Sequence, residues 1–310
     1  MTDHSDGTAS GEQPATPGSY GVPPRGHRLP ESTSLDGVVL QVADLERSLH
    51  FYQDVLGLQV LEQADRRAAL GAQGSYRALV RVVERRGSHP AGRRARLGLF
   101  HFAILLPDRA GLGRLVRHLS GTGVHVGAGD HLVSEAFYLS DPDGLGIEVY
   151  ADRPREAWRR IGRELRMATD PVDVPGLLAA AGDSEWTGMP PGTVMGHVHL
   201  HVGELDQAAA FYGDGLGFDR TTWSYPGALF LGAGGYHHHV GVNTWAGSAA
   251  ASPGVDDARL MEWTLVVPDA DSVAAVGASL ASAGYPIDHA TPEAFVAQDP
   301  WGTQVRVRSR

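Results

Sequence analysis

The sequence of 310 residues contains no cysteine, which excludes disulfide bonds, thiolate metal ligands, iron–sulfur clusters and a thiol nucleophile. It also lacks any apolar run of about 18 residues, so we expect no transmembrane helix and no membrane partner. Positive charge is scarce, with 26 Lys and Arg against 36 Asp and Glu, and no basic stripe could follow a phosphate backbone. We therefore expect no nucleic-acid partner, and any bound metal must have nitrogen and oxygen ligands.

Histidine, in contrast, is abundant, with 15 residues. At roughly 150 residues per domain the length indicates two domains, and 42% hydrophobic residues are enough for a sizeable core. Residues 1–33 are rich in Gly, Pro, Ser and Thr and lack the pattern of a signal peptide. This composition predicts a disordered tail in which His4 and His27 are solvated. We also expect the protein to be cytoplasmic.

The rest of the chain repeats itself. Four segments, starting at Leu35, Leu99, Met195 and Leu260, each begin with an alternating strand and continue into an amphipathic helix, followed by short β-like runs. Each repeat is thus predicted as a βαβββ module in an α+β fold. The second and fourth share a Pro-Asp turn whose Asp is placed to cap the helix.

The repeats group in pairs along the chain. We predict one domain at 34–150 (modules one and two) and another at 195–310 (modules three and four). The linker at 151–194 contains EAWRRIGRELRM, which is predicted to form a charged helix. Modules two and four end in matching DPxG hairpins, so Asp141 and Asp299 are interpreted as turn residues.

Four βαβββ modules, with the motifs GHVHLHV, YHHHVGVNTWAG and GDHLVSEAFYLSDPDGLGIEVYADRP, resemble the vicinal oxygen chelate superfamily. This superfamily includes glyoxalase I, bleomycin-resistance proteins and extradiol dioxygenases, and the motifs look most like two-domain bacterial catechol 2,3-dioxygenases. The resemblance covers Leu35 to Arg310 apart from the linker. It implies that modules pair as open half-barrels and that metal ligands come from the first and last strands of each module.

Only some modules have a ligand at those positions. Pairing modules two and three brings together His101, Glu148 and His197, which is the two-imidazole, one-carboxylate set of non-haem Fe(II) oxygenases. This requires a crossed arrangement, within one chain or across a dimer, with Gly37 and Arg306 at inactive positions. The competing set, from adjacent modules, is His197, His239 and Glu262. Fe(II) is the expected metal, with Mn(II), Ni(II) and Zn(II) as alternatives.

The HVHLH pattern places His197, His199 and His201 on one face of a strand, where three buried imidazoles favour a polar cavity over a packed core. His199 and His201 are therefore expected to line the substrate site, although an exposed face is the alternative. In the triple histidine, His237 and His239 share a face and His238 points away. The resemblance makes His239 an acid–base group near the metal, and His237, on the same face, is expected at the substrate, unless the run is a surface feature.

Four further residues complete the predicted site. Tyr138 stands where the other half has Val296, and the resemblance implies that its hydroxyl binds a substrate oxygen. His131 is a further catalytic candidate, although the Asp-His pair that contains it recurs in module four and could be structural. Phe137 and Trp245 could stack on an aromatic ring or belong to the core.

These observations favour an extradiol dioxygenase that opens catechol, or a simple substituted catechol, with O₂ to a product of the 2-hydroxymuconate semialdehyde type. The partners would be a small aromatic diol and O₂, and a homo-oligomer is one possible assembly. A glyoxalase-type lyase or isomerase is the first alternative, but such enzymes usually use two carboxylates, and Glu148 is the one convincing carboxylate here. A metal-free binding protein, like the bleomycin-resistance members, is the second alternative.

Overall fold

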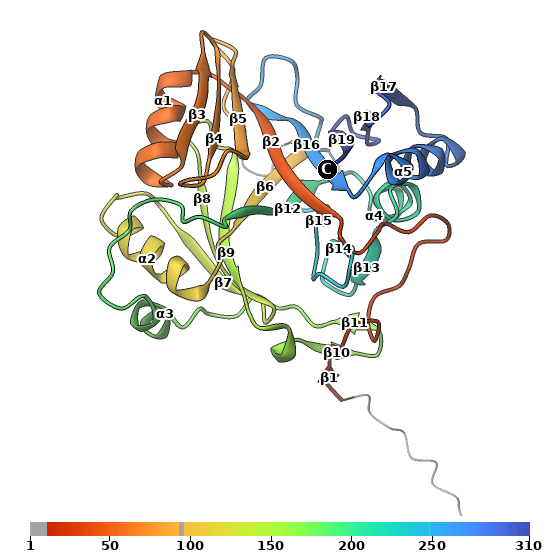
Figure 1. Cartoon of the computed structure of the whole chain (residues 1–310), viewed down its shortest axis with the longest axis horizontal. Coiled ribbons are helices and arrows are strands. Elements are labelled where there is room, and N and C mark those ends of the chain that lie inside the picture. The colour runs from red at the N-terminus through yellow and green to blue at the C-terminus, as the bar shows by residue number, and fades with distance from the viewer. Residues whose placement is uncertain (1–10, 93–95, 248) are drawn as a thin grey trace, which may run out of the picture.

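Each of the four sequence repeats folds as a βαβββ module in the computed structural model, which describes residues 11–92, 96–247 and 249–310 (Figure 1). Two helices continue for another turn or more as π-helix, at Phe51–Val55 after α1 and at Ala209–Gly215 after α4. Module one contains β2 (Ser34–Val42), α1 (Leu45–His50), β3 (Gln59–Ala64), β4 (Arg67–Gly71) and β5 (Ala78–Glu84). Module two contains β6 (Gly98–Leu105), α2 (Arg109–Leu119), β7 (Gly127–Asp130), β8 (Ser134–Ser140) and β9 (Gly146–Asp152).

The other two modules follow the same order after the linker. Module three contains β12 (Val194–His201), α4 (Leu205–Ala208), β13 (Asp219–Thr222), β14 (Ala228–Gly232) and β15 (Val240–Asn243). Module four contains β16 (Arg259–Val267), α5 (Ala270–Ser282), β17 (Ile287–Thr291), β18 (Ala294–Gln298) and β19 (Gln304–Ser309).

Aspartate caps begin three of the four module helices. Asp44, Asp108 and Asp269 each have extended backbone, and each side chain accepts a hydrogen bond from the backbone N–H three residues later. The capping expected of the two Pro-Asp turns is therefore confirmed. In these three modules the cap satisfies a backbone N–H group of the first helical turn and so fixes where the helix begins.

The modules pair crosswise in two eight-stranded sheets. One sheet has the order β13-β14-β15-β12-β6-β9-β8-β7, and the other has the order β17-β18-β19-β16-β2-β5-β4-β3. Modules two and three therefore share one sheet, and modules one and four share the other. In each sheet two first strands lie antiparallel at the centre, β6 with β12 and β2 with β16. The crossed arrangement forms within a single chain.

Two buried hydrogen bonds connect the sheets. The hydroxyl of Tyr52, in module one, donates to Asp141 of module two at 3.0 Å, and that of Tyr212, in module three, donates to Asp299 of module four at 2.7 Å. Both aspartates also accept hydrogen bonds from backbone N–H groups of their own DPxG turns. The turn interpretation of these aspartates therefore agrees with the structure, and each turn also ties one sheet to the other.

The predicted disordered tail is wrong for residues 11–33, whereas residues 1–10, including His4, lie outside the described residues. The strand β1 (Gln13–Pro14) pairs with the linker, and the hydroxyl of Tyr20 donates to the carbonyl of Gly235. Ala15, Tyr20 and Leu29 are buried. A few buried apolar side chains are enough to hold this segment against the folded protein, and the average composition of the segment does not reveal them. His27 is not fully solvated either: it is half-buried, and this burial lowers its pKa.

The charged helix predicted for EAWRRIGRELRM is also wrong. The segment contains one 3₁₀ turn (Arg155–Ala157) and a hairpin of β10 (Arg159–Ile161) and β11 (Glu164–Leu165). Trp158 is buried, and its indole N–H donates to the carbonyl of Arg153, while Gly162 has the positive φ of 60° that the turn requires. The helix of this linker is α3 (Val174–Ala181), which lies beside α2 in Figure 1.

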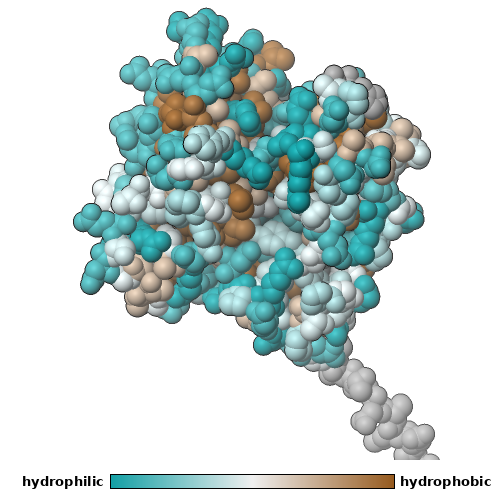
Figure 2. Space-filling model, viewed as in Figure 1, coloured by the Kyte–Doolittle hydropathy of each residue, from teal (hydrophilic) through white to brown (hydrophobic). Residues whose placement is uncertain are grey.

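The surface fits the sequence composition. Hydrophilic residues cover most of the face shown in Figure 2, and hydrophobic residues gather there in small separate patches. Among the described residues, no helix combines the length and the apolar character needed to cross a membrane.

Asp141 predicts a pH dependence of stability. Burial raises its pKa to about 7 in the folded protein, from an ordinary value of 3.8. The folded state then holds a proton that the unfolded chain has lost, so this group makes the free energy of unfolding fall as the pH rises from about 4 through about 7. Asp141→Asn should flatten that slope in urea unfolding between about pH 5 and about pH 8. Equal slopes for Asp141→Asn and the wild type would contradict this account.

Candidate metal centre

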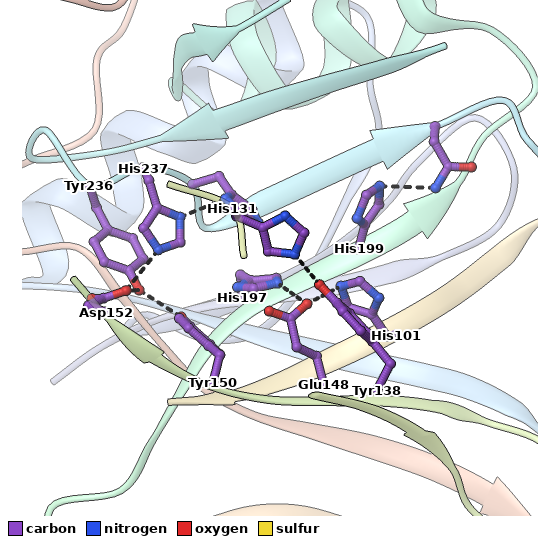
Figure 3. Close-up of polar contacts among 12 residues, drawn as sticks. His101, His131, Tyr138, Glu148, Tyr150, Asp152, His197, His199, Tyr236 and His237 are labelled. Atoms are coloured by element: carbon purple, nitrogen blue, oxygen red, sulfur yellow. Dashed lines mark hydrogen bonds and ion pairs between the residues drawn. The ribbon is translucent and has the colours of Figure 1, made fainter. Parts of the chain in front are cut away.

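Three predicted ligands converge at the centre of the sheet formed by modules two and three. His101 on β6, Glu148 on β9 and His197 on β12 are buried, and one ligand atom of each lies within 4.8 Å of the others. The Nε2 atoms of His101 and His197 lie 2.9 and 3.3 Å from the same oxygen of Glu148 (Figure 3). The set that the crossed pairing predicted is therefore brought together.

Strand register explains this convergence. Ala103 on β6 is opposite His197 on β12 and opposite Glu148 on β9, and His101 lies two residues earlier on β6. Side chains two residues apart on a strand share a face, so the three ligands surround the position of Ala103. The small alanine side chain leaves the space between the ligands free.

The ionisation of the cluster suits a divalent cation. Burial opposes charge on Glu148, but the two histidines outweigh that effect and hold the pKa of this carboxyl well below its ordinary value. Burial lowers the pKa of His197 to about 4, so its imidazole is neutral near pH 7. Among the described residues, His197 Nδ1 is buried without a hydrogen-bond partner, and His101 Nε2 is paired with the Glu148 oxygen. An anionic carboxylate between two buried imidazoles is a donor set that fits Fe(II), Mn(II), Ni(II) or Zn(II).

The competing ligand set is not brought together. Glu262 lies on β16 in the other sheet, where the guanidinium of Arg306 donates two hydrogen bonds to it at 2.8 and 2.9 Å. The positive charge that a carboxylate needs at this position is already supplied by arginine. His239, the third member of that set, lies away from the cluster.

A cavity of about 210 Å³ opens beside the three ligands. It is formed by modules two and three together with the linker segment that carries Met167 and Thr169. Its lining includes neither Lys nor Arg, and Glu148 is its one carboxylate. The lining residues are Phe100, His101, His131, Tyr138, Glu148, Met167, Thr169, His197, His199, Tyr225, Phe230, His238 and Trp245.

Tyr138 and His131 both face this cavity. The ring Nδ1 of His131 lies 2.7 Å from the carbonyl of Ala168, which can only accept, so Nδ1 carries the hydrogen and Nε2 accepts one from the hydroxyl of Tyr138 at 2.5 Å (Figure 3). Burial raises the pKa of Tyr138 well above its ordinary value, which keeps the hydroxyl protonated. Among the described residues, the one non-glycine residue with positive φ is Leu132, directly after His131, and such strain concentrates at functional sites.

His199 lines the cavity, but His201 does not. The side-chain amide of Asn243 donates to His199 Nε2 at 2.9 Å, and its oxygen lies 2.6 Å from His201 Nδ1. His201 faces a neighbouring cavity on the other side of Phe100. Sequence reasoning missed Asn243, although its place in the VNTW motif, opposite His201 in the β12–β15 register, was a usable signal.

The triple histidine presents the opposite face from the one predicted. His238 lines the cavity, with its ring centroid 4.1 Å from that of His197, whereas His237 and His239 do not. The Nδ1 of His239 accepts a hydrogen bond from the N–H of Ala233, and burial lowers its pKa to about 3. All three histidines precede β15, which begins at Val240, so strand alternation could not locate them relative to the cavity.

The two aromatic candidates have different positions. Trp245 lines the cavity and is 38% exposed, which places it at the mouth. Phe137 is buried in the main hydrophobic core and does not line the cavity. The aromatic walls that the sequence did not single out are Phe100, Tyr225 and Phe230.

Paired βαβββ modules with a His–Glu–His cluster on the inner face of their shared sheet define a metalloprotein-type centre in a half-barrel. The model of the Glyoxalase/Bleomycin resistance protein/Dioxygenase superfamily matches residues 34–149 and 194–307. The chain belongs to this superfamily, which confirms the resemblance seen in the sequence.

Relatives agree with that assignment. The chain is 47% identical over 274 residues to a catechol-2,3-dioxygenase of Bacillus subtilis (strain 168). The match covers 87% of this chain and 95% of the relative. Two solved structures share the fold at low identity. A putative dioxygenase from Bacillus subtilis subsp. subtilis str. 168 has a TM-score of 0.63 at 12% identity and covers 91% of this chain and 86% of its own. Glyoxalase I from Zea mays has a TM-score of 0.52 at 18% identity and covers 90% and 92%.

Glu148→Gln should abolish tight metal binding, because the amide removes the one anionic ligand. We expect the dissociation constant for Fe(II) or Mn(II), measured anaerobically by calorimetry or metal analysis, to rise by more than ~100-fold. The control is Glu262→Gln, which removes a carboxylate from the other sheet at the first-strand position equivalent to His101, and which should bind metal like the wild type. Equal metal affinity in Glu148→Gln and Glu262→Gln would contradict the assigned centre.

Proposed function

We propose that this protein is a metal-dependent extradiol ring-cleavage dioxygenase. It opens catechol, or a simple substituted catechol, with O₂ to a product of the 2-hydroxymuconate semialdehyde type. The observation that carries this proposal is the His101–Glu148–His197 cluster at the floor of an aromatic cavity. The identity of 47% to a catechol-2,3-dioxygenase over most of the chain supports it.

The proposed metal is Fe(II), held by the two imidazoles and the carboxylate. Three ligands on one face leave positions open, and a divalent ion bound there would lower the pKa of a catechol hydroxyl and bring the diol and O₂ to one centre. Mn(II) uses similar ligands, whereas glyoxalase-type use of Ni(II) or Zn(II) is disfavoured by the single carboxylate in the lining. Convergence of three ligand side chains disfavours a metal-free binding protein.

The proposed proton acceptor is His238, in place of His239. Its ring lies beside that of His197 at the cavity wall, and its Nδ1 is engaged by His237, so Nε2 remains for the substrate. A proton leaving a catechol hydroxyl would form an N–H bond at this Nε2, and the electron pair would stay on the substrate oxygen. Histidine suits both this step and the later return of the proton.

Tyr138 is proposed to orient the substrate. Because its hydroxyl hydrogen is donated to His131, the phenolic oxygen is left to accept a hydrogen bond from a substrate hydroxyl. His131 thus acts through Tyr138, and its own Nδ1–H is fixed by the carbonyl of Ala168.

The cavity favours one uncharged aromatic ring. A cavity of about 150 Å³ is known to hold benzene, so about 210 Å³ accommodates a single ring with two hydroxyls. Phe100, Phe230 and Trp245 supply aromatic faces and edges for stacking. With neither Lys nor Arg in its lining, the cavity offers no partner for a substrate carboxylate.

Substitutions of His238 and of His239 should show which of the two histidines is the acid–base group. For iron-loaded protein supplied with catechol and O₂, we expect oxygen uptake and a yellow product. His238→Gln should lower kcat by ~100-fold or more because the acid–base group is lost, whereas His239→Gln should stay within a few-fold of the wild type. A larger loss in His239→Gln would restore the assignment made from the sequence.

Substrate charge should matter as well. A catechol that carries a carboxylate, such as 3,4-dihydroxybenzoate, should show a kcat/KM at least ~10-fold lower than 4-methylcatechol, because the charge would be desolvated without a basic partner. Steady-state oxygen uptake with the two substrates measures this ratio. Equal kcat/KM values would show that ring substituents reach solvent through the mouth beside Trp245.

A further inference from the structure

Behind His238 lies a chain of two more polar side chains. The Nδ1 atoms of His238 and His237 are 2.7 Å apart, and the Nε2 of His237 lies 3.0 Å from an oxygen of Asp152 (Figure 3). His237 is fully buried, whereas the side chain of Asp152 is 29% exposed. The chain therefore runs from the cavity wall to a half-buried carboxylate at the end of β9.

The hydrogens along this chain follow from its end. As a carboxylate, Asp152 can only accept, and it also accepts from the hydroxyl of Tyr236 at 3.2 Å. His237 therefore donates from Nε2, which leaves its Nδ1 without a hydrogen in the neutral ring. His238 must then donate from its Nδ1, and its Nε2 carries no hydrogen.

We propose that Asp152 and His237 are positioning residues for the reaction, because they hold His238 in the tautomer whose bare Nε2 faces the cavity. Without His237, the Nδ1 of His238 would lose its acceptor, and the ring could place its single hydrogen on Nε2 instead. That hydrogen would point toward the substrate and would block acceptance of a proton. The reaction step itself rests on the proposed function, but the tautomer does not.

The surroundings hold this pair in place. The ring of His237 lies 4.1 Å from that of Tyr236 and 5.5 Å from that of Trp158, measured between centroids. The hydroxyls of Tyr150 and Tyr236 are hydrogen-bonded at 2.6 Å. Trp158 comes from the linker segment after β9, so the linker closes the back of the chain. This packing explains why a tryptophan in a charged segment is buried.

The three consecutive histidines would then have three different roles. His238 faces the substrate cavity, His237 fixes its tautomer, and His239 is bound elsewhere by the N–H of Ala233. Glu148, Tyr150 and Asp152 alternate along β9 and share one face, so the strand that supplies the metal carboxylate also supplies the carboxylate behind His238.

The tautomer can be measured directly. Heteronuclear NMR of histidine-labelled, metal-free protein separates Nδ1–H from Nε2–H rings, and loss of one signal set in His238→Gln assigns that residue. We expect Nδ1–H at His238 in the wild type and in His237→Gln, whose side-chain oxygen can accept from His238 while its amide donates to Asp152. In His237→Phe we expect Nε2–H to appear.

Kinetics with the iron-loaded variants provide the second readout. His237→Phe should lower kcat by ~10- to 100-fold, as loss of an outer-shell partner does, with KM within about 2-fold, and His237→Gln should restore most of kcat. The control is Tyr236→Phe. It removes the hydroxyl that donates to Asp152 but keeps the ring against His237, so the tautomer of His238 should be unchanged. If His237→Phe fails to fold, Asp152→Ala, at a half-buried position, tests the same series of hydrogen bonds. Nε2–H at His238 is again expected.

Three results would overturn the proposal: Nε2–H at His238 in the wild type, equal kcat losses in His237→Phe and His237→Gln, or a changed tautomer in Tyr236→Phe. Failure of the wild type to open any catechol would instead overturn the dioxygenase function. The NMR result decides the tautomer independently of turnover, so the two failures are distinguishable.

Discussion

The antiparallel pairing of β6 with β12 is the contact on which the candidate site depends. Each strand carries one histidine ligand, and the two strands belong to different halves of the sequence. Glu148 joins them because β9 runs parallel to β6 on its other side. Any other pairing of the modules would leave two ligands in one sheet and the third elsewhere. The metal centre is thus a property of the crossed topology.

The second sheet has the same strand arrangement but cannot form such a centre. At the position equivalent to a ligand, Gly37 is in such close contact with β5 that an added Cβ would lie 2.8 Å from the carbonyl oxygens of Ala78 and Leu79. Glu262 is neutralised by Arg306 through two hydrogen bonds. A guanidinium therefore does in one sheet what a cation would do in the other, because a partly buried carboxylate needs a positive partner in either case.

Much of this could be predicted from the sequence, since repeats fix register. Aligning the modules identified His101, Glu148 and His197 from their positions in first and last strands, and strand geometry then guaranteed that they share a face. The same rule failed for His238 and His239, because these residues precede β15 and lie outside regular alternation. Composition failed for residues 11–33 and for the linker, where single anchors such as Tyr20 and Trp158 outweigh the polar residues around them. Asn243 was missed because its role depends on partners brought from another strand.

The buried histidines show why the cluster, and no other group nearby, is suited to a cation. Each of the surrounding imidazoles has a protein partner: Asn243 serves His199 and His201, the Ala233 amide serves His239, and the chain from Asp152 serves His237 and His238. His197 Nδ1 is buried without a hydrogen bond, which costs about 1–3 kcal/mol, and His101 Nε2 is paired with the Glu148 oxygen 2.9 Å away. Beside Glu148, the lowered pKa of the carboxyl favours a positive charge. Binding of a divalent ion by His101, Glu148 and His197 would therefore stabilise the folded protein as well as serve the reaction, because the ion would neutralise the buried carboxylate.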